Sequence, residues 1–198
     1  MVSIFLSMLV FAFIGAVSPG PVNIIATGAG ANFGFRQALP HVVGASVSYS
    51  LVVLTTGLAL NALLYWLPSL TEALKYLGGA FLLYIAVKIA CSPVATQAER
   101  ALAKPPSLLQ GALAQGLNPK AWLVAMSGVS LFVSAQQPAW LYLLVFCSIS
   151  LIVCLAGVGT WAAIGSLIAR YLQSPMRMRV FNVLMALLLA VSVLSLFV

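Results

Sequence analysis

The chain has 198 residues, of which 63% are hydrophobic and only 6% are charged, and its formal net charge at pH 7 is +7. Soluble domains carry about 25% charged residues, so this composition excludes a soluble globular domain and indicates an integral membrane protein. The basic residues lie mostly in short stretches between apolar runs, where they set membrane orientation. We therefore predict one membrane domain that does not bind nucleic acid.

Six apolar stretches follow one another and predict an all-α protein with six transmembrane helices, at residues 2–27, 39–67, 70–91, 108–133, 140–169 and 180–198. The first stretch lacks the positively charged start of a signal peptide, so we interpret it as a retained helix. A Gly-rich turn is expected at residues 28–36, and Pro68 is expected to make a tight turn. In the third stretch, Gly78 and Gly79 predict a close helix approach.

The most polar stretch, residues 92–106, divides the chain into two three-helix repeats, 1–91 and 107–198. The loops after helices one, three and five contain seven basic residues, whereas those after helices two and four contain only Lys75. The seven are Arg36, Lys88, Arg100, Lys104, Arg170, Arg177 and Arg179. This bias predicts cytoplasmic odd loops, a cytoplasmic linker at 92–106 and outward-facing termini.

Two helix-breaking motifs lie 100 positions apart, Pro19-Gly20-Pro21 in the first predicted helix and Asn118-Pro119-Lys120 in the fourth. Proline removes a backbone N–H and clashes with the carbonyl one turn earlier. Because three helices precede the second half, that half enters the membrane in the opposite sense. Inverted three-plus-three repeats with interrupted helices in matching positions are typical of transporters, whose substrate sites lie at the broken ends.

The first break offers groups that suit a carboxylate. The half-helix after Pro21 begins with free N–H groups and a partial positive charge, and an anion is the ligand that such an end prefers. Asn23 can donate and accept hydrogen bonds, and Ser18 adds a hydroxyl. A kink that only shapes packing is the alternative. The pair of prolines and the matching break favour a substrate site made of Ser18, Pro19, Gly20, Pro21 and Asn23.

The second break adds Gln115, Asn118, Pro119 and Lys120 to the candidate substrate site. Lys120 is the only cation well inside an apolar run. It either points into a cavity, where it would hold a carboxylate, or is a loop charge at the membrane surface. The sequence favours neither of these two alternatives.

A polar stripe on the second helix contains His41, Ser48 and Thr55 at intervals of seven, with Gly44 on the same face. Such a stripe should face the helix bundle. Imidazole titrates near neutral pH, so His41 is a candidate for proton coupling, although a lone histidine near a helix start is more often a surface residue. Arg36, His41 and Ser48 are therefore candidate coupling or gating residues.

Acidic residues are nearly absent, since the chain has no aspartate and only Glu72 and Glu99. Cation-selective pores and metal transporters need buried carboxylates or histidine clusters, so both classes are disfavoured. The composition suits a small neutral or zwitterionic solute and predicts no metal site, cofactor or enzymatic activity. Cys91, Cys147 and Cys154 form no CxxC motif and are expected to be buried and inert.

Four segments in order resemble the LysE/RhtB family of bacterial amino-acid exporters: Ser18 to Pro21, Gly34 to Ala38, Tyr76 to Tyr84, and Asn118 to Lys120. The resemblance covers essentially the whole chain. It implies an inner-membrane carrier that expels amino acids or their derivatives by exchange with protons. The family's exporters of basic amino acids carry membrane-embedded aspartates, which this sequence lacks, so the resemblance implies the neutral branch.

Two other classes of function remain as alternatives. A membrane thiol relay would place a cysteine beside the proline of each broken helix, but Ser18 and Asn118 occupy these positions. A structural assembly subunit without transport would leave the two matching breaks without a role. Small residues on helix faces also permit a homodimer within the lipid bilayer.

Overall fold

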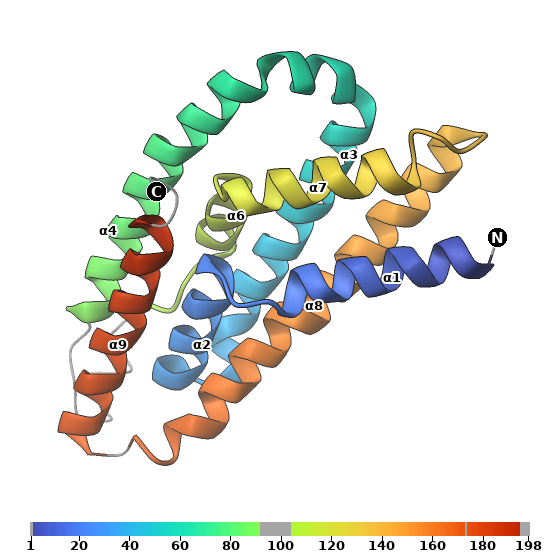
Figure 1. Cartoon of the computed structure of the whole chain (residues 1–198). Helices are drawn as coiled ribbons and strands as arrows, with labels where there is room; N and C mark the ends of the chain where they lie inside the picture. The colour runs from blue at the N-terminus through green and yellow to red at the C-terminus, as the bar shows by residue number, and fades with distance from the viewer. Residues whose placement is uncertain (1, 92–103, 173, 195–198) are drawn as a thin grey trace.

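The computed structural model describes residues 2–91, 104–172 and 174–194, and within these ranges the regular secondary structure is entirely helical (Figure 1). The helices in chain order are α1 (Val2–Val17), α2 (Pro21–Phe33), α3 (Phe35–Ala73), the π-helical segment η1 (Leu74–Gly78), α4 (Gly79–Ala90), α6 (Leu108–Gly116), α7 (Pro119–Phe132), α8 (Ala139–Ala169) and α9 (Pro175–Leu194). The predicted linker at 92–106 lies mostly outside the described residues.

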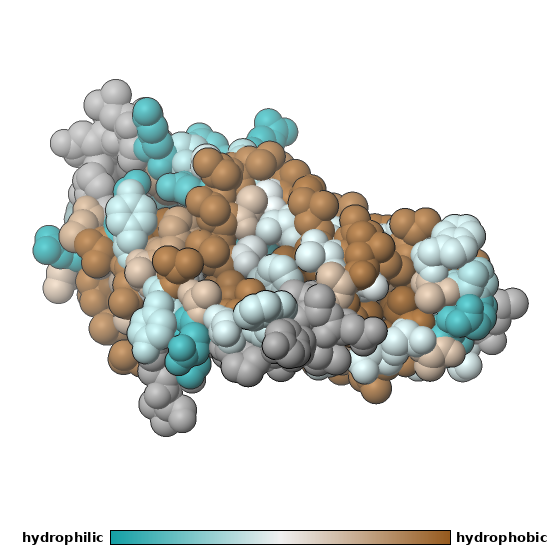
Figure 2. Space-filling view, turned by 90° about the horizontal axis from the view of Figure 1, so that it is seen from above, coloured by the Kyte–Doolittle hydropathy of each residue, from teal (hydrophilic) through white to brown (hydrophobic). Residues whose placement is uncertain are grey.

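Three of the described helical segments are long and apolar enough to cross a membrane: Phe35–Leu60 in α3, Ala139–Ala169 and Pro175–Leu194. A fourth span results if the bent pair Ser3–Val17 and Pro21–Phe33 crosses as one unit. The protein is thus a multi-pass membrane protein, and the presence of six membrane spans stays a prediction. Large apolar side chains are exposed along most helices, and Figure 2 shows them over much of one face, with hydrophilic residues toward its margins. An apolar surface of this kind suits contact with lipid tails.

Both predicted helix breaks are present. The first helix ends at Val17 and resumes at Pro21 as α2, with a bend of 61°. The second break separates α6, which ends at Gly116, from α7, which begins at Pro119. In both cases the resumed helix begins at a proline, which lacks the N–H that a first-turn residue does not need.

Three predicted boundaries are wrong. The stretch from Gly28 is not a turn, because α2 continues to Phe33 and only Gly34, at φ 86°, leaves the helix. Pro68 does not make a tight turn, because α3 continues to Ala73 and its backbone departs from helical geometry earlier, at Ala59. The last helix begins at Pro175, so Arg177 and Arg179 lie in its first turns.

Packing explains why the Gly-rich stretch is helical. A Cβ atom at Gly30 would overlap the backbone carbonyl of Ala162, and one at Gly165 would overlap that of Thr27, so α2 and α8 touch backbone to backbone. Small residues permit this close approach in membrane proteins. These glycines therefore serve a helix interface, and the tertiary contact overrides their weak helix propensity.

Each broken helix packs against the long helix of the other half of the chain. α1 and α2 lie along α8, α6 and α7 lie along α3, and α4 pairs with α9 (Figure 1). Glycines again mark the close points: Gly44 meets Leu108, and Gly111 meets the His41 backbone. The predicted close approach at Gly78 is confirmed, since a Cβ there would overlap the Leu117 carbonyl. These pairings bring the two breaks, distant in sequence, to the same place.

Candidate functional site

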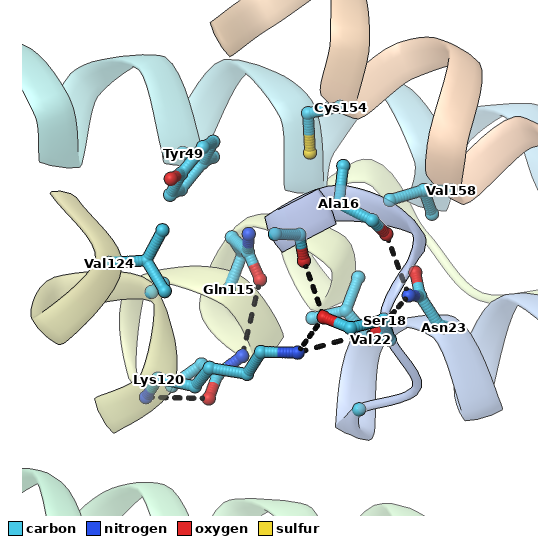
Figure 3. Close-up of a pocket in the computed structure, with 14 residues that line it drawn as sticks. Ala16, Ser18, Val22, Asn23, Tyr49, Gln115, Lys120, Val124, Cys154 and Val158 are labelled. Carbon is cyan, nitrogen blue, oxygen red and sulfur yellow. Dashed lines mark hydrogen bonds between the residues drawn. The ribbon is translucent and has the colours of Figure 1, made fainter. Parts of the chain in front are cut away.

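The two helix breaks meet at one cavity of about 40 Å³, which also touches α3 and α8 (Figure 3). Its lining comprises Gly15, Ala16, Ser18, Gly20, Val22 and Asn23 from the first break, Gln115, Asn118, Lys120, Ala121 and Val124 from the second, and Tyr49, Cys154 and Val158 from the long helices. We call it the break cavity. Most of the candidate substrate residues line this cavity, and Pro19, Pro21 and Pro119 shape the backbone beside it.

Lys120 crosses from the first turn of α7 to the first break. Its Nζ donates to Ser18 Oγ at 2.6 Å and lies 3.3 Å from the Ser18 carbonyl oxygen and 3.4 Å from that of Pro19. The side chain is half-buried and forms part of the cavity wall. Lys120 thus lines the cavity, as the first of its two alternatives requires, while its depth in the membrane stays a prediction.

The first break is held together by side chains, but the start of α2 is left open. Asn23 Nδ2 donates to the carbonyls of Ala16 and Ser18, at 2.9 and 3.0 Å, and so satisfies the end of α1. Trp161 Nε1 donates to the Val17 carbonyl at 3.1 Å. The N-cap of α2 is Gly20, which is extended and offers no side-chain cap. The first-turn amides of α2 therefore remain available to an anion.

The second break is capped differently. Asn118 Oδ1 accepts a hydrogen bond from the Lys120 backbone N–H at 3.1 Å, which caps α7, and its Nδ2 lies 3.4 Å from Gln115 Oε1. Asn118 thus already satisfies the helix end that it precedes. Between the two breaks, only the first presents an uncapped helix N-terminus, while the second supplies the lysine.

His41 is fully buried, so its interpretation as a surface residue is wrong. Its Nε2 lies 3.3 Å from the carbonyl oxygen of Val22. Because a carbonyl can only accept, Nε2 carries the hydrogen and the neutral ring leaves Nδ1 as an acceptor. Nδ1 has no hydrogen-bond partner. His41 therefore joins α3 to the first turn of α2, directly behind the break cavity.

The polar stripe on α3 is only partly as predicted. Ser48 Oγ donates to the Ala112 carbonyl at 2.9 Å, and Gly44 contacts α6, so this part faces the bundle. Thr55 is exposed and does not continue the stripe. Arg36 is also exposed, at the start of α3, and does not line the break cavity.

Charge in the break cavity is one-sided. None of the described residues that line it is acidic, and Lys120 is its one cation. The described part of the chain contains no cluster of three or more His, Cys, Asp or Glu side chains that could hold a metal ion. The arrangement can bind a carboxylate through an ammonium group that lies beside a helix N-terminus, and none of its described lining residues is an acid that would compensate a cationic side chain.

Sequence reasoning missed the contributions of α3 and α8 to this cavity. Tyr49 and Cys154 line its wall, above the broken helices in Figure 3. Neither stands out from its apolar surroundings in the sequence, so no local signal identifies them. The prediction of three buried cysteines is confirmed for Cys147 and Cys154 and wrong for Cys91, which is exposed just after α4 ends.

Comparison with known proteins gives a consistent match. The family model of LysE type translocators matches residues 13–197. The cysteine/O-acetylserine efflux protein of Salmonella choleraesuis (strain SC-B67) is 32% identical over 184 residues, and that of Escherichia coli (strain K12) is 31% identical over 184 residues. Each of these alignments covers 90% of both chains. No solved structure gives a significant match.

Proposed function

The chain belongs to the LysE type translocator family, and from that premise we propose that it exports neutral amino acids or close derivatives across the bacterial inner membrane in exchange for protons. The observation that carries this proposal is the meeting of the two helix breaks at one cavity that holds a lysine and no described acid. An ammonium group beside an uncapped helix N-terminus suits the carboxylate that all amino acids share.

The remainder of the break cavity favours a small solute without net charge. Val124 and Val158 provide apolar walls, and Gln115 and Tyr49 provide polar groups for orientation. A cationic side chain would meet Lys120 without a compensating carboxylate. The relatives named for cysteine and O-acetylserine efflux support solutes of this size and charge.

The structure supports a closed form of this site. A cavity of about 40 Å³ has room for a few water molecules at most, whereas ligand pockets usually measure about 300–1,000 Å³. Lys120 must break its hydrogen bond to Ser18 before it can bind a solute carboxylate instead. We propose that this exchange of partners accompanies the change between inward and outward access.

We further propose the inverted repeat of residues 1–91 and 107–198 as the basis of alternating access. Equivalent contacts support it, because the broken helix of each half packs on the long helix of the other and the two third helices, α4 and α9, pair together. From the charge bias we propose that the loops after helices one, three and five are cytoplasmic and that both termini face outward. His41 is the proposed proton carrier, and a homodimer is compatible with the small-residue helix faces.

Export from cells tests the proposal. Cells that overexpress the protein are loaded with dipeptides, so that free amino acids accumulate inside, and the medium is analysed by mass spectrometry. Gly20→Leu is the inactive variant, because an added Cβ already lies 3.5 Å from Lys120 Nζ and a longer side chain displaces the lysine. Gly159→Leu is the matched control, since its Cβ would meet only Val42 at 4.0 Å.

We expect a neutral amino acid or derivative to leave faster from wild-type and Gly159→Leu cells than from Gly20→Leu cells at equal membrane levels. Export of lysine or arginine in place of neutral solutes would contradict the charge argument. Equal export by all three proteins would contradict the assignment of the break cavity as the substrate site.

A further inference from the structure

A second and larger cavity, of about 380 Å³, lies between α2, α4 and α6. Its size falls within the usual range of ligand pockets. The described lining residues are Ile25, Gly28, Ala29, Asn32, Phe33, His41, Ile85, Lys88, Ile89, Cys91, Lys104, Pro106 and Gln110. We call it the entry cavity. It shares no lining residue with the break cavity.

The lining chemistry selects for a carboxylate with an apolar body. Lys88 and Lys104 bring positive charge to the cavity, and none of its described lining residues is acidic. Ile25, Ile85 and Ile89 form an apolar wall of the same cavity. An anion without an apolar part would leave that wall unused, and a solute with a cationic side chain would meet two lysines and no acidic side chain among the described lining residues.

His41 connects the two cavities. It forms part of the entry cavity wall, while its Nε2 is hydrogen-bonded to the carbonyl of Val22, which lines the break cavity. Its Nδ1 is enclosed and has no partner. His41 therefore links the two cavities through its contact with the Val22 carbonyl, and its enclosed Nδ1 is not open to a solute in either cavity.

We propose that the entry cavity is a separate binding site, in which a zwitterionic amino acid with a small apolar side chain is held before it passes to the break cavity. Its carboxylate faces the lysines, and its side chain packs on the isoleucines. This inference rests on the proposed export function. By the positive-inside rule the lysines place this cavity on the cytoplasmic side, where a solute for export enters.

Cys91 provides a direct assay, because it is exposed and lines the entry cavity. Purified protein in lipid nanodiscs is treated with a small maleimide, and the rate of labelling at Cys91 is followed by peptide mass spectrometry, which separates it from the buried Cys147 and Cys154. The probe is O-acetyl-L-serine, and L-lysine is the cationic control. We expect O-acetyl-L-serine to slow labelling of Cys91 and L-lysine to leave it unchanged.

Three glycine variants locate the protection. A Cβ at Gly28 would meet only Ile89, at 3.9 Å, so Gly28→Leu fills the entry cavity without a backbone clash. We expect it to weaken protection about tenfold or more, the lower end of what a steric mismatch costs. Gly159→Leu, which lies in neither cavity, should keep protection. Gly20→Leu should also keep it, although this variant is expected to lose export.

The outcomes separate the two proposals. If wild-type protein exports O-acetyl-L-serine but the solute does not slow labelling of Cys91, the entry cavity is not a binding site and the export function stands. If labelling is slowed and export is absent, the binding site stands and the export function falls. Equal loss of protection in Gly28→Leu and Gly159→Leu, or equal protection by L-lysine, would overturn the inference.

Discussion

The substitution Lys120→Met tests the centre of the proposed mechanism. Methionine keeps the length and apolar stem of lysine and removes the ammonium group, so the change isolates the charge. In the structure this ammonium group has one short hydrogen bond, to Ser18 Oγ at 2.6 Å, and two longer contacts to the carbonyls of Ser18 and Pro19. The proposal requires the same group to bind the solute carboxylate when the break cavity opens.

The expected magnitude follows from the hydrogen bond that this ammonium group is proposed to form with the solute carboxylate. A hydrogen bond to a charged group contributes about 1.5–3 kcal/mol. Because each 1.36 kcal/mol is a factor of ten in rate, Lys120→Met should lower kcat/KM for export by about 10- to 150-fold. Ser18→Ala removes only the hydroxyl partner and leaves the charge for the carboxylate. It should therefore have a smaller effect than Lys120→Met.

The assay is counterflow of radiolabelled O-acetyl-L-serine in proteoliposomes with matched protein content. Lys75→Met is the control, because Lys75 is also a lysine within a helix but lines neither cavity. A normal kcat/KM in Lys120→Met, or an equal loss in Lys75→Met, would refute the assignment of Lys120 as the carboxylate anchor.

Three further predictions concern stability, measured as the free energy or midpoint of unfolding in nanodiscs. Gly30→Ala should destabilise the protein by about 1–3 kcal/mol because its Cβ overlaps the Ala162 carbonyl, whereas Gly28→Ala should be neutral or slightly stabilising; equal effects would contradict the α2–α8 contact. Asn182→Leu breaks the reciprocal amide pair with Asn32, at 2.8 and 3.2 Å, and should cost about 0.6–1.7 kcal/mol, a loss that should be smaller when Asn32 is replaced as well. Gly34→Ala should cost about 1–3 kcal/mol despite open space, because φ 86° and ψ 162° suit only glycine; an unchanged midpoint would show that this loop relaxes freely.

Local chemistry made several features predictable from the sequence. An apolar, charge-poor composition leaves helices as the way to satisfy backbone groups in a bilayer, and the described structure is helical. Proline acts on its own turn of helix, so the breaks before Pro21 and Pro119 were correctly predicted. Glycine is more ambiguous, since it suits both a turn and a close helix contact, and the sequence alone favoured the wrong choice at Gly30.

The candidate site depended on contacts between residues about 100 positions apart, which no local pattern contains. Lys120 could be assigned to a cavity only when α7 was placed beside the first break. His41 is buried because α2 and α6 cover its side of α3, and Cys91 is exposed because α4 ends before it. Sequence determined the helical class and the two helix breaks, because proline acts locally. Tertiary packing decided that residues 28–33 are helical, which helix faces are buried and which side chains meet in a site.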